Sequence, residues 1–123
     1  MARILVVDDE EFARFTMREI LEDAGHDVAE AVNGVEGLAL QKARPFDIII
    51  TDIIMPEKEG VQTIIELRRD FPELPVIAVS GGGRTRNLDF LKIAKEHGAK
   101  RILPKPFSEE QLLEAVDACL TPS

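Results

Sequence analysis

The sequence predicts an α/β domain, a doubly wound, five-stranded parallel sheet with helices on both faces. Short strand-like runs alternate five times with segments of helical periodicity, an order typical of parallel sheets. Two of the runs, 48–51 and 76–79, are apolar or β-branched throughout, as in strands buried on both faces. The hydrophobic content of 45% and charged content of 31% fit a globular chain of 123 residues.

The first half of the chain supplies two strands and two helices. Residues 3–7 form an apolar run, and the pattern of residues 11–24 indicates an amphipathic helix followed by a helix-ending glycine. Residues 27–31 predict the second strand. Residues 35–43 predict the second helix, which Pro45 closes. The apolar positions of the first helix are Phe12, Phe15, Met17, Ile20, Leu21 and Ala24.

The second half continues the alternation. Residues 48–51 predict the third strand, and residues 61–68 the third helix. The fourth strand, 76–79, leads into a serine and three glycines. A thinner apolar pattern at 88–94 indicates a fourth helix.

The fifth strand and the fifth helix complete the predicted fold. Residues 100–103 form the strand, and Ser108 with Gln111 forms a capping-box pair that starts a helix running to Leu120. No repeat, linker or composition change divides the chain, so residues 1–123 are predicted to be a single domain.

Composition excludes several classes of function. A net charge of −8 disfavours direct binding to nucleic acid, because the phosphate backbone attracts basic surfaces. No run approaches the roughly 20 apolar residues of a membrane span, and the first strand is too short for a signal peptide. The one cysteine, Cys119, lies in an apolar helical pattern, where a core residue is expected, and fits a reducing cytoplasm.

Polar residues of selected types follow four of the predicted strands. Asp8 and Asp9 follow the first strand, Asp52 the third, Ser80 the fourth and Lys105 the fifth. In an open parallel sheet ligands bind beyond the carboxyl ends of the strands. These side chains are therefore predicted to converge on one site.

Three clustered carboxylates need a cation, or they must take up protons. At about 4 Å and an effective dielectric near 20, each pair repels by about 4 kcal/mol. The ligands are hard oxygens without His or Cys, which favours Mg²⁺, with Mn²⁺ as a plausible substitute, over zinc. Mg²⁺ combines carboxylates with phosphate oxygens, and Lys105 and Ser80 could neutralise a transferring phosphoryl group. A carboxylate can itself serve as the nucleophile and form an aspartyl phosphate.

Four motifs lie in order at these strand ends: Asp8-Asp9; Asp52 with Met55-Pro56 and Gly60; Ser80; and Lys105-Pro106-Phe107. Together they resemble the receiver domain of bacterial two-component response regulators, over residues 3–120. Each motif alone is weak, but the ordered set is highly specific. The resemblance implies a flavodoxin-like fold with sheet order 2-1-3-4-5, and a stand-alone, chemotaxis-type regulator.

The resemblance also implies the roles of the acidic residues. Asp52 is expected to accept a phosphoryl group from a phosphohistidine on a sensor kinase or a histidine phosphotransfer protein. Asp9 and Asp52 are expected to bind Mg²⁺ through their carboxylates, and Ile54 through its backbone carbonyl. Asp8 is expected to act through a bound water.

Further implied roles concern the phosphoryl group and the partners. Lys105 is expected to pair with the phosphoryl oxygens, with a cis bond to Pro106, and Ser80 to donate a hydrogen bond to that group. The fourth helix, fifth strand and fifth helix are expected to bind a protein target. Such a protein is not an enzyme beyond its own phosphorylation and dephosphorylation.

One position departs from the family pattern, and two other classes of function fit the sequence less well. Ile102 stands where the family usually has Tyr or Phe. Ile102 is therefore expected to pack alike in the unphosphorylated and phosphorylated states, and other residues are expected to carry the change between these states.

A Mg²⁺-dependent phosphohydrolase usually carries a second Asp two residues after its nucleophile, where this chain has Ile54. A flavin-binding protein is disfavoured by the acidic pair and by the lack of Trp and Tyr.

Overall fold

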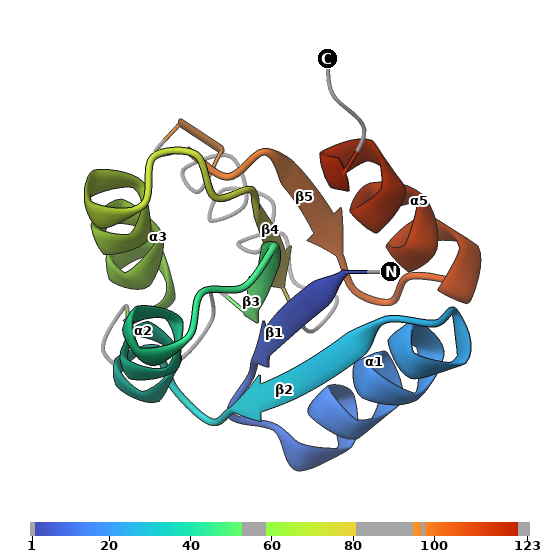
Figure 1. Ribbon diagram of the computed structural model, residues 1–123. Helices are drawn as coiled ribbons and strands as arrows, with labels where there is room; N and C mark the ends of the chain where they lie inside the picture. The colour runs from blue at the N-terminus through green and yellow to red at the C-terminus, as the bar shows by residue number, and fades with distance from the viewer. Residues whose placement is uncertain (1, 53–58, 81–94, 97, 121–123) are drawn as a thin grey trace.

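The computed structural model describes residues 2–52, 59–80, 95, 96 and 98–120. Strands and helices alternate through residues 3–80, and a further strand and helix lie within residues 101–120 (Figure 1). The predicted fourth helix, at 88–94, lies outside the described residues. The elements are β1 (Arg3–Val7), α1 (Glu11–Asp23), β2 (Asp27–Ala31), α2 (Gly34–Ala43), β3 (Ile48–Asp52), α3 (Glu59–Asp70), β4 (Val76–Ser80), β5 (Arg101–Pro104) and α5 (Glu109–Leu120).

The strands form one parallel sheet in the order β2-β1-β3-β4-β5. This confirms the predicted fold class and strand order. The chain leaves β1 toward β2 on one side and later places β3 on the other side, so the winding direction reverses between β1 and β3. A crevice at such a reversal, beyond the carboxyl ends of the strands, is where ligands bind in open α/β sheets.

Each face of the sheet is buried under helices. Because successive side chains of a strand point to opposite faces, Ile48 and Ile50 pack toward α1 and α5, whereas Ile49 packs toward the α3 side. The helices α1 and α5 lie on one face of the sheet, and α2 and α3 on the other (Figure 1). The buried isoleucines of β3 explain why its sequence lacks the polar alternation of a half-exposed strand.

Helix α1 corrects part of the sequence interpretation. Its pattern predicted Phe12 and Phe15 as apolar positions of an amphipathic helix, but their exposed fractions are 75% and 56%. At 3.6 residues per turn, Phe12 lies nearly opposite Leu21 on the helix. Met17 and Leu21 are the residues of α1 that are buried against the sheet. The two phenylalanines therefore lie on the surface of the protein and not in its core.

Helix α5 begins as predicted. The Ser108 amide donates to Oε1 of Gln111 at 2.8 Å, and the Gln111 amide donates to Oγ of Ser108 at 3.1 Å. This reciprocal pair is the predicted capping box. Cys119 is buried in the core, and burial raises the pKa of its thiol, as expected for a structural cysteine.

Among the residues that the structure describes, no helix has both the length and the apolar character needed to cross a membrane.

Candidate functional site

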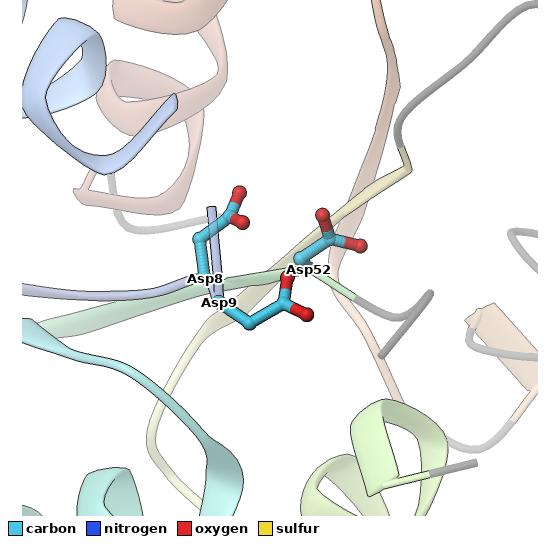
Figure 2. A group of neighbouring side chains, drawn as sticks. All are labelled: Asp8, Asp9 and Asp52. Carbon is cyan, nitrogen blue, oxygen red and sulfur yellow. The ribbon is translucent and has the colours of Figure 1, made fainter. Parts of the chain in front are cut away.

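The ends of β1 and β3 carry three carboxylates that meet. Asp8 and Asp9 directly follow β1, and Asp52 is the last residue of β3, the neighbouring strand. One oxygen atom from each carboxylate lies within 4.8 Å of those of the other two (Figure 2). Asp8 and Asp52 are buried, whereas Asp9 is exposed. Asp8, Asp9 and Asp52, the acidic cluster, come together as the sequence predicted.

Lys105 brings a positive charge to the acidic cluster from the segment after β5. Its Nζ atom donates to Oδ2 of Asp8 at 2.9 Å and to Oδ2 of Asp52 at 3.2 Å. Burial by itself would lower the pKa of Lys105, but the hydrogen bond to Asp8 and the charge of Asp52 outweigh burial and raise this pKa. The amine is therefore charged at neutral pH. The bond between Lys105 and Pro106 is cis, as the family resemblance implied.

The charges of this site fit a divalent cation. Lys105 pairs with Asp8 and Asp52, and its single formal charge cannot balance the three carboxylates of the cluster. Like charges held this close repel strongly unless a cation joins them. Carboxylate oxygens are the ligands that Mg²⁺ and Mn²⁺ prefer. The acidic cluster can thus hold a divalent metal ion.

Asp8 is fixed at each of its polar groups. Its amide donates to the carbonyl of Ala31 at 3.1 Å, which extends the contact between β1 and β2. Its Oδ1 atom accepts from the Glu10 amide at 2.9 Å, and its Oδ2 atom accepts from Lys105. Its carbonyl accepts from Nη1 of Arg14 at 2.8 Å. Asp8 is consequently held from four directions, and its side chain is fully buried.

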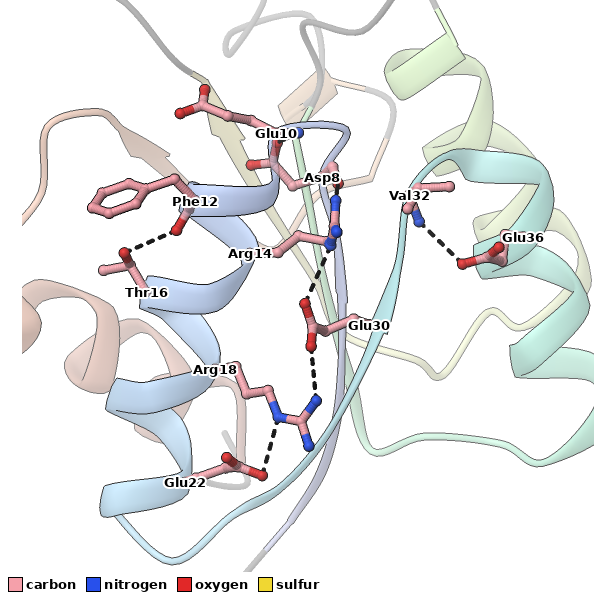
Figure 3. A network of polar contacts seen from close by, with 10 residues as sticks. All are labelled: Asp8, Glu10, Phe12, Arg14, Thr16, Arg18, Glu22, Glu30, Val32 and Glu36. Atoms are coloured by element: carbon pink, nitrogen blue, oxygen red, sulfur yellow. Dashed lines mark hydrogen bonds and ion pairs between the residues drawn. The ribbon is translucent and has the colours of Figure 1, made fainter.

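An ion-pair network links Asp8 to α1 and β2. Nε of Arg14 donates to Oε1 of Glu30 at 3.2 Å, and Nη1 of Arg18 donates to Oε2 of Glu30 at 2.7 Å. Arg18 also pairs with Glu22 at 3.2 Å (Figure 3). The hydrogen bond from Arg18 lowers the pKa of Glu30; burial opposes this shift, and Arg14 reinforces it.

Reasoning from the sequence missed Arg14 and Glu30. The available signal was Glu30 itself, a charged residue in the interior of the five-residue strand Asp27–Ala31. Such a residue requires a partner when a helix covers its face of the sheet. The partner could not be identified among the several basic residues of the chain without the structure.

Two predicted site residues are described incompletely or not at all. Ser80 ends β4, opposite Pro104 of β5, so its backbone lies at the same edge of the sheet as Asp52. The Ser80 side chain and the whole of Ile54 lie outside the described residues. Their expected contacts with a phosphoryl group and a metal ion stay predictions.

An apolar hollow of about 420 Å³ adjoins Lys105, between α1 and the segment after β5. Phe12 and Met17 line its α1 side, and Pro106 and Phe107 line the other side. The exposed ring of Phe12 therefore borders a depression next to the acidic cluster.

Ile102 is half-buried on the opposite face of the sheet from Leu103. It packs against the core under α2 and α3. The expectation that Ile102 packs alike in the phosphorylated and unphosphorylated states stays a prediction.

Comparisons with known proteins agree with the geometry. The family described as response regulator receiver domain matches residues 4–117. Protein PilH of Pseudomonas aeruginosa is 37% identical over 123 residues, covering 98% of this chain and 98% of PilH. The chemotaxis protein CheY of Thermotoga maritima is 35% identical over 116 residues, covering 94% of each chain.

Solved structures show the same fold. The receiver domain of NtrX from Brucella abortus superposes with a TM-score of 0.90 at 32% identity, covering 98% of this chain and 99% of that domain. A longer NtrX chain from the same bacterium matches with a TM-score of 0.89, and the present chain spans 26% of it.

Proposed function

The chain belongs to the family of response regulator receiver domains, and on that premise we propose that Asp52 is its phosphoryl acceptor. Receiver domains of this family are phosphorylation-switched signalling modules of two-component systems. The observation that supports Asp52 most directly is its position. Its carboxylate ends the central strand β3, belongs to the acidic cluster, and accepts a hydrogen bond from Lys105.

The transfer reaction follows from these groups. A carboxylate oxygen of Asp52 attacks the phosphorus atom of a phosphohistidine, the new O–P bond forms, and the P–N bond to the imidazole breaks. The imidazole keeps the bonding electron pair and takes up a proton. Lys105, already charged and 3.2 Å from Asp52, stabilises the negative charge on the phosphoryl oxygens. Ser80 donates a further hydrogen bond to them.

We propose Mg²⁺ as the metal of this site, with Mn²⁺ able to replace it. Asp9, Asp52 and the backbone carbonyl of Ile54 would hold the ion, and Asp8 would act through a water. When bound, the ion supplies positive charge that offsets the charge of the phosphoryl oxygens. Asp8 keeps Lys105 oriented toward Asp52, because both carboxylates accept from the same amine.

Receiver domains exchange signals with histidine kinases and with downstream targets. For this chain we propose a sensor histidine kinase or a histidine phosphotransfer protein as the donor, and a protein target on the face of the fourth helix, β5 and α5. Nucleic acid and membranes are not proposed as partners, since the net charge is −8. The protein would act in the cytoplasm and catalyse only its own phosphorylation and dephosphorylation.

The proposal is tested with acetyl phosphate, a small phosphodonor. In the presence of Mg²⁺, intact-mass analysis should show one added phosphoryl group on the unaltered protein and none on Asp52→Asn. A chelator should prevent the addition. Addition of one phosphoryl group to Asp52→Asn under the same conditions would show that another residue is the acceptor.

A further inference from the structure

The carbonyl group of Asp8 lies in the connection between strand β1 and helix α1. Strand β1 ends at Val7 and helix α1 begins at Glu11, so the Asp8 carbonyl, unlike the Asp8 amide, belongs neither to the sheet nor to the helix. A buried carbonyl without a partner costs free energy. The Arg14 side chain, one turn into α1, reaches back and donates to this carbonyl at 2.8 Å (Figure 3).

This hydrogen bond acts on the connection between the two neighbouring carboxylates. The Asp8 carbonyl is part of the planar peptide unit that joins Asp8 to Asp9, and a planar peptide rotates as one body. The direction of the carbonyl therefore sets the direction in which the chain enters Asp9. Asp9 is exposed, and its backbone orientation thus depends more on this peptide unit than on burial of its side chain.

The guanidinium of Arg14 is itself held in one orientation. Its Nε atom donates to Glu30 at 3.2 Å while its Nη1 atom donates to Asp8, so the two ends of the planar group are engaged at once. Its side chain is only 13% exposed. Glu30 lies on β2 in register with Val6 of β1, and Arg18 binds the other oxygen of Glu30. The network thereby anchors the Asp8–Asp9 peptide to β2.

We propose that Arg14 is a positioning residue for the metal site, which it serves by fixing the peptide unit between Asp8 and Asp9. The inference rests on the proposed function, because it assigns Arg14 a role in binding the ion that Asp9 and Asp52 are proposed to hold. Arg14 touches neither the ion nor the phosphoryl group in this account. Groups that orient metal ligands typically alter affinity on the order of tenfold or more when they are removed.

The direction in which Mg²⁺ affinity changes when Arg14 is replaced separates positioning from simple electrostatics. Arg14 carries a positive charge and donates to the carbonyl of Asp8, a member of the acidic cluster. If charge alone mattered, removal of this cation would strengthen the attraction between the cluster and Mg²⁺. If Arg14 positions the ligands, its removal weakens Mg²⁺ binding although one positive charge has been lost.

The experiment measures the Kd of Mg²⁺ alone by isothermal titration calorimetry for the unaltered protein, Arg14→Gln and Arg18→Gln. Arg18 is the matched control, because it lies on the same helix and binds the same Glu30 but forms no hydrogen bond or ion pair with Asp8. We expect Arg14→Gln to weaken binding on the order of tenfold and Arg18→Gln to leave the Kd within about twofold. Thermal unfolding of each variant, without Mg²⁺, reports the loss of the ion pairs separately.

Each other outcome counts against the inference. An unchanged or stronger affinity in Arg14→Gln, or an equal weakening in Arg18→Gln, would overturn the positioning role while the proposed function stands. Absence of Mg²⁺ binding by the unaltered protein would overturn both. If Arg14→Gln does not fold, Arg14→Lys decides: it keeps the charge but loses the planar two-ended donor, so unaltered affinity in Arg14→Lys contradicts the inference and weaker affinity supports it.

Discussion

At the scale of single residues, the site is a balance between one amine and three carboxylates. Lys105 joins Asp8 and Asp52 by hydrogen bonds of 2.9 and 3.2 Å, while Asp9 is exposed at the edge of the cluster. Because the pKa of Lys105 is raised, its stabilising contribution is present at neutral pH and is lost only when the pH rises through that raised pKa. The remaining negative charge is the part that a divalent cation would stabilise.

A prediction at this scale concerns Asp9. An ion that binds only the folded protein stabilises it by about 2.7 kcal/mol at a hundred times its Kd. We therefore expect millimolar Mg²⁺ to raise the melting temperature, and Asp9→Ala to remove most of that rise, because Asp9 is a proposed ligand. Differential scanning calorimetry with and without Mg²⁺ measures the effect.

Asp23→Ala is the matched control for Asp9→Ala. Asp23 is an exposed carboxylate at the far end of α1, and its removal should leave the Mg²⁺ response intact. An undiminished rise in Asp9→Ala would show that Asp9 does not bind the ion.

At the scale of elements, α1 serves both the core and the site. Met17 and Leu21 attach α1 to the sheet, while Arg14 and Arg18 attach it to Glu30 on β2. Periodicity predicted the helix because a buried stripe recurs with the helical repeat. Periodicity did not separate Phe12 and Phe15 from that stripe. A step of three or four residues is not a whole turn of 3.6 residues, so apolar residues joined by such steps can lie on different faces of the helix.

A pH prediction concerns Glu30. Its pKa is lowered from 4.5, chiefly by the hydrogen bond from Arg18. A lowered carboxyl pKa in the folded state gives stability that is present above the unfolded pKa and is lost as the pH falls through the folded value. Glu30→Gln should therefore cost about 1 to 3 kcal/mol near pH 7, and the deficit relative to the unaltered protein should shrink as the pH is lowered below about 4.

Urea unfolding at pH values from 3 to 7 measures this deficit. Glu22→Gln is the control, because the pair between Arg18 and Glu22 is half-exposed on one helix and should contribute little. A deficit in Glu30→Gln that stays constant or grows toward acid pH would contradict the assigned ion pairs.

At the scale of the whole molecule, the fold brings together residues that are far apart in the chain. Lys105 meets Asp8 across 97 positions and Asp52 across 53. The order of strands predicts this meeting, because β1, β3 and β5 run in the same direction and end at one edge of the sheet. The residue types at those ends then predict the chemistry.

The supporting contacts could not be predicted in the same way. The bond from Arg14 to the Asp8 carbonyl depends on how the chain turns from β1 into α1. A side chain that binds a backbone carbonyl leaves no complementary residue in the sequence, so no pair of side-chain types signals it. The sequence pattern thus predicts the acidic cluster, whereas the hydrogen bond from Arg14 to the Asp8 carbonyl is visible only in the three-dimensional structure.

The central claim is that Asp52 accepts the phosphoryl group, and chemical mapping on the unaltered protein tests it most directly. After reaction with acetyl phosphate and Mg²⁺, borohydride reduces an acyl phosphate and converts that aspartate to homoserine. Peptide mass spectrometry should find homoserine at position 52. Homoserine at position 8 or 9 instead, or at no position while the intact mass shows a phosphoryl group, would contradict the claim.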